Sequence, residues 1–180
     1  MKKYIPFMKS EPVVAVVRLQ GAINNMGSGL DDPSLAPAIE KAFRRGKPAA
    51  VALQINSPGG SPAQSSLIAS RIRRLSEEKG IPVFAFVEDV AASGGYWLAC
   101  AADEIYVDPS SIVGSIGVIS AGFGFTDLIA TYGVERRVHT AGESKSMIDP
   151  FKPEKPKDVA RLNTLLEDIH ALFIDHVKSR

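Results

Sequence analysis

The sequence contains little cysteine and little histidine, and both shortages limit what the chain can be. Cys100 is its single cysteine, so an internal disulfide is impossible and the partners for a zinc cluster are missing. It lies in the apolar run 98–102, where we expect a buried structural thiol. The three histidines, His139, His170 and His176, are widely spread. A disulfide scaffold is therefore excluded, and a histidine metal site is not expected.

The chain also has almost no net charge and no long apolar run. Its 21 basic and 20 acidic residues leave a formal charge of +1, which excludes a polybasic nucleic-acid binder and an acidic disordered tail. No window reaches the roughly 18 apolar residues of a membrane-spanning helix. The stretch 4–8 after Lys2 and Lys3 is too short for a signal peptide. We expect a soluble chain, cytoplasmic or peripheral to a membrane, that binds no nucleic acid.

The apolar residues that are present suffice for one globular domain. Hydrophobic residues make up 45% of the 180 positions. Short β-rich runs alternate with helical segments, and this order predicts an α/β layered fold with a largely parallel sheet. We predict strands at 13–19, 49–55, 82–87, 104–107, 117–120 and 134–139, and helices at 35–43, 62–78, 94–102 and 157–179.

The predicted boundaries are an N-terminal extension at 1–12 and a single domain at 13–180. The helix from residue 62 has the clearest signals, with Ser61 at the N-cap, Pro62 at the first helical position and Gln64 placed to complete a capping box. The last helix has no glycine or proline stop signal before Arg180, which predicts a chain truncated at its C-terminus.

Three segments combine glycine, serine and lysine in ways that packing alone does not require. The first is Asn56-Ser57-Pro58-Gly59-Gly60, which follows a predicted strand. Glycines at such a place let the backbone approach a ligand closely and point N–H groups outward. The alternative is an ordinary turn between a strand and a helix.

The second segment is 91–97, in which Ser93 stands between a strand and a helix and is followed by Gly94 and Gly95. A serine there is placed as a nucleophile would be, and the Gly94 N–H could stabilise an oxyanion. The alternative is that Ser93 is only the N-cap of the helix.

The third segment is 141–151, in which small hydroxyl residues flank Lys145 and an apolar Met-Ile pair follows. Desolvation lowers the pKa of a lysine and makes its amine usable as a general base. The alternative is a lysine in a surface loop.

Together these segments resemble the signal peptide peptidase A family, peptidase family S49, which shares the Clp-protease/crotonase fold. The resemblance runs from about Val13 to the final helix. Four motifs carry it in order, at 56–60, 92–96 and 114–118 and from Gly142 through Lys145 to Pro150. It implies a single-repeat peptidase domain with a Clp/crotonase-like layered fold of stacked ββα units.

The resemblance also implies a role for each matching residue. Ser93 falls on the nucleophile, Lys145 on the general base, and Ser115 on the serine that orients the lysine amine. The implied reaction is peptide hydrolysis through an acyl-enzyme, with no metal and no other cofactor. Ser115 could equally be a turn serine between two glycines.

The implied oxyanion hole combines the Gly94 N–H with one N–H of the pair Gly59 and Gly60, and the sequence leaves open which glycine donates. The implied substrates are extended hydrophobic peptides such as remnant signal peptides. The family further implies a homo-oligomer and a peripheral association with membranes, since its members usually carry a membrane anchor.

Other interpretations remain open. Clp-type peptidases use a Ser-His-Asp triad, but the first histidine after Ser93 is His139, which favours the Ser-Lys dyad. Crotonase-type enzymes hold acyl-CoA thioesters with similar oxyanion geometry, but they need neither Ser93 nor Lys145. A non-catalytic scaffold subunit of a ring is the third interpretation.

Overall fold

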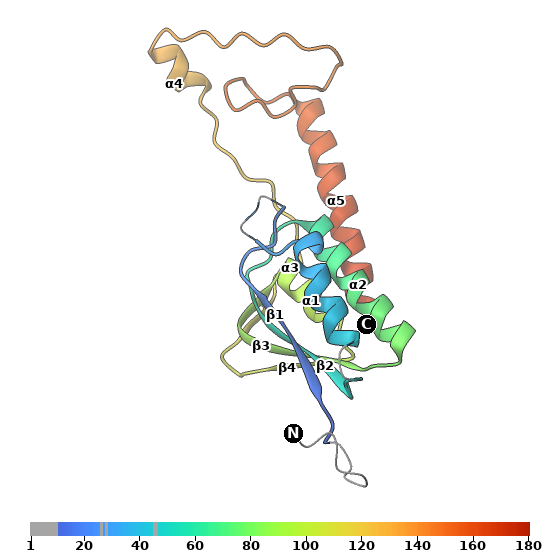
Figure 1. Ribbon diagram of the computed structural model, residues 1–180. Coiled ribbons are helices and arrows are strands. Elements are labelled where there is room, and N and C mark those ends of the chain that lie inside the picture. The colour runs from blue at the N-terminus through green and yellow to red at the C-terminus, as the bar shows by residue number, and fades with distance from the viewer. Residues whose placement is uncertain (1–10, 26, 28, 45–46) are drawn as a thin grey trace. The chain divides into compact units, whose positions relative to one another are not determined.

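The computed structural model describes residues 11–25, 27, 29–44 and 47–180 (Figure 1). The predicted N-terminal extension therefore lies almost entirely outside the described residues. The chain divides into two compact units. One comprises the residues up to Ile116 together with Phe173–Arg180, and the other comprises Gly117–Leu172.

The first unit alternates strands and helices along the chain. Its elements are β1 (Val14–Gln20), α1 (Asp32–Arg44), β2 (Ala50–Ser57), α2 (Pro62–Lys79), β3 (Val83–Ala92), α3 (Gly94–Ala99), β4 (Glu104–Val107) and β5 (Ile112–Gly114). The second unit contains α4 (Thr126–Thr131) and most of α5 (Pro156–Lys178), whose last residues belong to the first unit.

The described strands form one five-stranded sheet in which every pairing is parallel. Its order is β1-β2-β3-β4, and β5 also pairs with β3. Helices α1, α2 and α3 lie on one face of this sheet (Figure 1). The inward side chains Leu19, Leu53 and Ala85 are fully buried beneath them. The predicted α/β fold with largely parallel pairing is confirmed.

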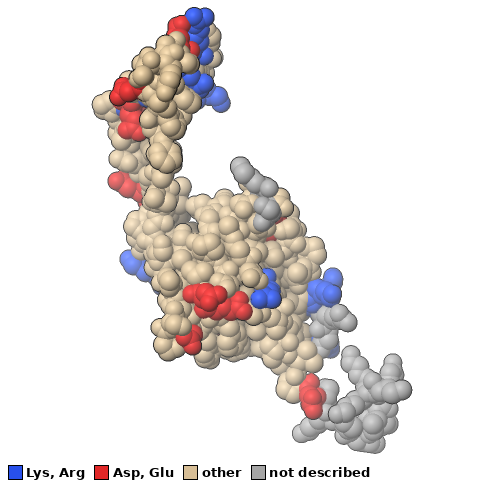
Figure 2. All heavy atoms as spheres, turned by 90° about the vertical axis from the view of Figure 1, so that its left-hand side faces the viewer, with Lys and Arg blue, Asp and Glu red and all other residues tan. Residues whose placement is uncertain are grey.

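The opposite face of the sheet is partly apolar and exposed. Along β1, Val14 and Val16 alternate with the partly buried Ala15 and the buried Val17 and are 54% and 62% exposed. Phe86 of β3 and Tyr106 of β4 stack on this face with ring centroids 5.1 Å apart. Figure 2 shows the side of the molecule on which the strands lie, and most of that surface carries no charge.

Several predicted boundaries were wrong. Strand β3 continues to Ala92, past the predicted end at Val87, because its last residues pair with β5. Neither 117–120 nor 134–139 forms the predicted strand, and the strand in this region, β5, lies at Ile112–Gly114. β-propensity acts only where a partner edge is available, and neither segment finds one among the described residues.

The signals around α2 were mostly confirmed. Ser61 caps the helix by accepting the Gln64 N–H at 3.4 Å, and Gly80 ends it in the left-handed conformation. The reciprocal half of the predicted capping box was wrong. The Gln64 side-chain oxygen accepts the N–H of Asp32 at 2.8 Å and so joins α2 to the start of α1.

The end of α5 packs on α3. Phe173 is buried with its ring 4.8 Å from that of Trp97, and the His176 ring stacks on Trp97 at 4.7 Å. Arg180 donates to the carbonyl oxygens of Cys100 and Ala102 at 3.0 and 3.1 Å. These bonds satisfy carbonyl groups that follow the short helix α3, which therefore depends on the end of α5.

Phe173→Ala tests this packing. The substitution removes a buried ring, so we expect the free energy of unfolding to fall by about 3–5 kcal/mol in a denaturant titration. Leu172→Ala is the matched control, because Leu172 is 63% exposed and should change stability by less than about 0.5 kcal/mol. Equal effects of the two substitutions would contradict the described packing.

The same contact predicts a dependence on pH. Burial lowers the pKa of His176, the hydrogen bond to the Trp97 carbonyl opposes this, and the charge of Arg180 lowers it further. The unfolded chain therefore binds a proton more readily, and stability should fall as pH drops below the ordinary histidine pKa of about 6.5. His176→Gln keeps a donor that does not titrate. The free energy of unfolding of this variant should vary less between about pH 7 and pH 5. The same pH dependence as in the wild type would contradict the assignment of this effect to His176.

Candidate active site

The carboxyl ends of three strands bring separate sequence motifs together. Ser57 ends β2, Ala92 ends β3 and Gly114 ends β5. Because these strands are parallel, the segments that follow them meet at one edge of the sheet, where α/β proteins commonly bind ligands. The Ser93 N–H donates to the Gly114 carbonyl at 2.8 Å, which joins two of the motifs directly.

Ser93 has an unusual backbone conformation and an unused side chain. Its φ of 51° and ψ of −122° are those of the first central position of a type II′ turn, which glycine normally occupies. A non-glycine residue held in such a region costs on the order of 1–3 kcal/mol. Ser93 stands at the N-cap of α3, but its hydroxyl makes no capping hydrogen bond. The side chain is half-buried and is available for other contacts.

Glycines permit the close approach of the turn after β2 to the start of α3. A Cβ on Gly59 would lie 2.7 Å from the Gly94 nitrogen, and one on Gly94 would lie 2.3 Å from Ser65 Oγ. A Cβ on Gly60 would lie 2.0 Å from the carbonyl oxygen of Ile23, a residue in the loop after β1. Side chains at these positions would separate the segments.

The peptide between Gly59 and Gly60 is held in one orientation. The Gly59 carbonyl accepts the Ile23 N–H at 2.8 Å, and the Ser61 N–H donates to the Ile23 carbonyl at 2.8 Å. In a trans peptide the C=O and the N–H point in opposite directions. The Gly60 N–H therefore points away from Ile23, and the Gly60 nitrogen lies 3.3 Å from the place of a Cβ on Gly94.

Two backbone donors on this edge have no partner among the described residues. The Gly59 N–H is used, since it donates to Ser57 Oγ at 3.2 Å. The N–H groups of Gly60 and Gly94 donate no hydrogen bond within the part of the chain that the structure describes. A carbonyl oxygen presented to both groups would receive two hydrogen bonds beside the Ser93 side chain.

Ser115 follows Gly114 directly and has a φ of 54°. Its side chain is exposed, and the bond between Ser93 and Gly114 keeps it on the same edge of the sheet as Ser93. The first unit thus brings together Ser93, Ser115, Gly59, Gly60 and Gly94.

Lys145 lies in the second unit, so it is not among the residues that the first unit brings together. It is exposed in a turn in which its N–H donates to the Gly142 carbonyl at 3.4 Å. The turn is anchored to α5 by an ion pair between Glu143 and Lys157 and by Arg161, which donates to Ser144 Oγ at 3.5 Å.

Other reactive groups of the first unit are already engaged or inert. Cys100 is buried, as expected, and burial raises the pKa of its thiol. His176 hydrogen-bonds the Trp97 carbonyl at 3.0 Å. In the described ranges no cluster of three or more His, Cys, Asp or Glu side chains is arranged to hold a metal ion. No helix among the described residues is long and apolar enough to cross a membrane.

Ser57 is the residue of this edge that the sequence did not single out. It is fully buried, and its hydroxyl donates to the Gly21 carbonyl at 2.7 Å while accepting the Gly59 N–H. A serine oxygen that accepts the N–H two residues later makes an ST turn. The local sequence Ser-Pro-Gly was the available signal.

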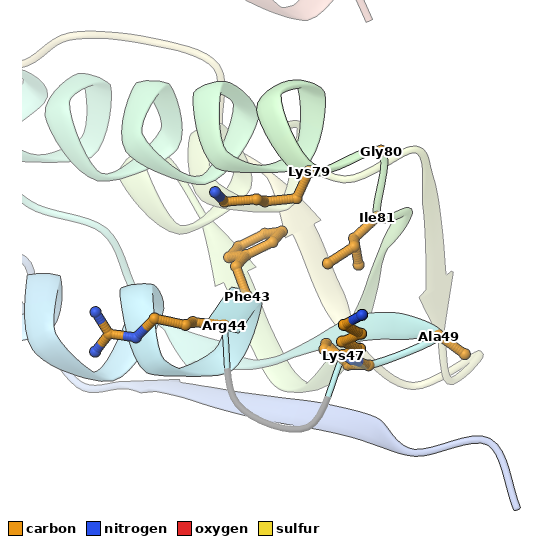
Figure 3. Close-up of a pocket in the computed structure, with 8 residues that line it drawn as sticks. Phe43, Arg44, Lys47, Ala49, Lys79, Gly80 and Ile81 are labelled. Carbon is orange, nitrogen blue, oxygen red and sulfur yellow. The ribbon is translucent and has the colours of Figure 1, made fainter. Parts of the chain in front are cut away.

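A cavity of about 590 Å³ lies at the other end of the strands (Figure 3). It is lined by residues that precede β2 and β3, including Ala49 and Ile81, and by Arg44, Lys47 and Lys79. Figure 3 shows the Arg44 and Lys47 side chains extending in different directions. Because the cavity adjoins the amino ends of the strands, it is separate from the edge that carries Ser93.

Comparison with known proteins identifies the family. The sequence model of the family described as "Peptidase family S49" matches residues 76–180, a segment that includes Ser93, Ser115 and Lys145. The chain belongs to peptidase family S49. This confirms the resemblance drawn from the four motifs, and the S49 match covers more than half of the chain.

Curated relatives agree with the S49 assignment. The chain is 31% identical to the chloroplastic serine protease SPPA of Arabidopsis thaliana, with 89% of the chain and 24% of that protein covered. It is 37% identical to the probable protease SohB of Haemophilus influenzae, with 68% of the chain and 35% of that protein covered.

A more similar relative carries a different name. The chain is 55% identical to a protein of Brucella melitensis named "Na(+)/H(+) antiporter NhaA", with 100% of the chain but only 25% of that protein covered. The S49 chain thus spans about a quarter of the length of the first relatives that it matches. The name belongs to the whole of that longer protein.

Among solved structures, a mutant of the membrane-bound stomatin-specific protease 1510-N is 22% identical, with a TM-score of 0.48 over 64% of the S49 chain and 52% of that structure.

Gly60→Ala tests the crowding at this edge. The added Cβ meets the Ile23 carbonyl in a backbone of φ 147°, so we expect a loss of stability of about 2 kcal/mol or more. Gly80→Ala is the matched control. Gly80 also has a positive φ, but a Cβ there meets nothing within 4 Å, so it should cost about 1 kcal/mol. A Gly60 variant as stable as the Gly80 variant in denaturant titrations would contradict the described approach of Ile23.

Proposed function

We propose that this S49 chain is a serine peptidase domain in which Ser93 is the nucleophile and Lys145 the general base. The observation that carries the proposal is the pair of free N–H groups on Gly60 and Gly94 beside the unused hydroxyl of Ser93. A serine hydroxyl beside two N–H donors is the arrangement that stabilises the oxyanion of acyl transfer, and backbone strain such as that of Ser93 clusters at active sites.

The first step forms an acyl-enzyme. Ser93 Oγ attacks the peptide carbonyl carbon, and Lys145 Nζ takes the hydroxyl proton. The oxygen of the tetrahedral intermediate accepts hydrogen bonds from Gly60 and Gly94. The amine then leaves with a proton returned by Lys145. Water next attacks the ester carbon while Lys145 takes its proton, and that proton returns to Ser93 Oγ as the acid product leaves.

Within this proposal Gly60, rather than Gly59, completes the oxyanion hole. The Gly59 N–H already donates to Ser57 Oγ, whereas the Gly60 N–H points away from Ile23 and is free. Loss of one such donor typically slows acyl transfer by about 100- to 1000-fold.

Ser115 orients the lysine amine in the proposed site, because it lies on the edge that carries Ser93. Lys145 is exposed in the second unit, so contact with Ser93 requires the two units, from one chain or from neighbouring copies, to meet. A homo-oligomer is consistent with this requirement.

The proposed substrates are extended hydrophobic peptides such as remnant signal peptides. A relative from Enterococcus faecium, 33% identical over 60% of this chain and 31% of its own length, is named a putative signal peptide peptidase SppA. An extended peptide can lie beside the Gly59-Gly60 segment and bind through main-chain hydrogen bonds, as in strand addition. Peripheral membrane association would place the domain near such substrates.

Labelling with a serine-directed acylating probe, followed by peptide mapping, tests the dyad. We expect one adduct, on Ser93, that is absent in Ser93→Ala. Lys145→Ala should slow labelling by about 100-fold or more, because it removes the general base. Lys155→Ala, a change of another exposed lysine in the second unit, is the control and should label at the wild-type rate.

Failure of the folded wild-type chain to label would contradict the proposal and favour a non-catalytic subunit of an assembly. Labelling that Lys145→Ala leaves unchanged would remove Lys145 from the mechanism. The mass of the same sample in solution distinguishes two causes of such a failure. A monomer would indicate incomplete assembly, and an oligomer that does not label would indicate a non-catalytic subunit.

A further inference from the structure

Ser57 lies beneath the proposed oxyanion hole and is completely buried. It ends β2, and its side chain is among the few polar groups of the described core. A Cβ on Gly95 would lie 2.4 Å from the Ser57 carbonyl oxygen, so α3 packs directly against this residue. Ser57 therefore touches both the turn that carries Gly60 and the helix that follows Ser93.

The Ser57 hydroxyl makes two hydrogen bonds in opposite senses. It donates to the Gly21 carbonyl at 2.7 Å and accepts the Gly59 N–H at 3.2 Å. Gly21 follows β1, so one side chain joins the end of β1 to the turn after β2. A buried hydroxyl that both donates and accepts has a fixed direction, since rotation would leave a buried partner unsatisfied.

The glycine turn has the freedom to adopt other orientations unless it is held at both ends. Gly59 and Gly60 have φ values of 96° and 147°, in a region that glycine enters at little cost. Ile23 holds the Gly59 carbonyl, and Ser57 holds the Gly59 N–H. If the Ser57 contact is lost, the Ile23 contacts alone hold this turn, and the position of the Gly60 N–H beside Gly94 is less firmly fixed.

We propose that Ser57 is a positioning residue, which occupies the Gly59 N–H and thereby directs the Gly60 N–H to the substrate oxyanion. The inference rests on the proposed function, because it concerns the same oxyanion hole. Ser57 itself touches no reacting atom.

Ser57→Ala tests the inference, with Ser76→Ala as the matched control. Ser76 is also a buried serine, 6% exposed, whose hydroxyl donates to a backbone carbonyl, that of Ile81 at 2.8 Å. It lies near the far end of α2, about 20 Å along the helix from Ser61. Both variants lose a buried hydroxyl, so both should unfold at a lower temperature than the wild type.

Catalysis should separate the two variants. With a chromogenic ester or a hydrophobic peptide substrate, Ser57→Ala should lower kcat by about 10- to 100-fold and leave KM nearly unchanged, because the oxyanion bond forms in the transition state. Ser76→Ala should change neither constant. A Ser57→Ala variant with the kcat of Ser76→Ala would overturn the inference while leaving the dyad intact.

Two further measurements keep the inference testable. Ser57→Cys keeps the size and a weaker acceptor, so its kcat should lie between those of the wild type and Ser57→Ala, and it replaces Ser57→Ala if that variant does not fold. Amide hydrogen exchange at Gly59 should be faster in either Ser57 variant than in Ser76→Ala, and equal exchange would contradict the positioning role. An inactive, folded wild-type chain would overturn the proposed function and this role together.

Discussion

The candidate site depends on the orientation of one peptide group, that between Gly59 and Gly60. The Ile23 N–H fixes its carbonyl, and the planarity of the peptide then directs the Gly60 N–H away from Ile23, with the Gly60 nitrogen close to Gly94. Only glycine fits at position 60, since a Cβ there would meet the Ile23 carbonyl oxygen. The donor is therefore set before any substrate arrives, which is the condition for efficient electrostatic stabilisation of a transition state.

The parallel sheet brings the other segments of the candidate site next to this peptide. Each strand ends at the same edge, so the turn after β2, the serine after β3 and the residue after β5 meet without long loops. The bond from Ser93 to Gly114 and the ST turn of Ser57 tie these ends together. Ser93 leads directly into α3, which is itself held by the end of α5 through Phe173 and Arg180.

Sequence patterns predicted the elements that are determined locally. The caps of α2, the amphipathic α5 and the alternation of strands and helices follow from capping chemistry and periodicity. The strands predicted at 117–120 and 134–139 were wrong, because pairing depends on an available edge that periodicity does not reveal. The sequence likewise left Gly59 and Gly60 equivalent, since they differ through the bond from the Gly59 N–H to Ser57 and through contacts with Ile23, which lies far away in the chain. Ser57 was missed for the same reason, because half of its role is a bond to Gly21.

A crystal structure of the chain acylated or phosphonylated on Ser93 tests the central claim most directly. The account predicts the adduct oxygen about 2.7–3.1 Å from both the Gly60 and the Gly94 nitrogens, with the Gly59 carbonyl still on Ile23. An oxygen bonded to the Gly59 N–H instead, or a Gly59-Gly60 peptide turned so that its N–H faces Ile23, would contradict it.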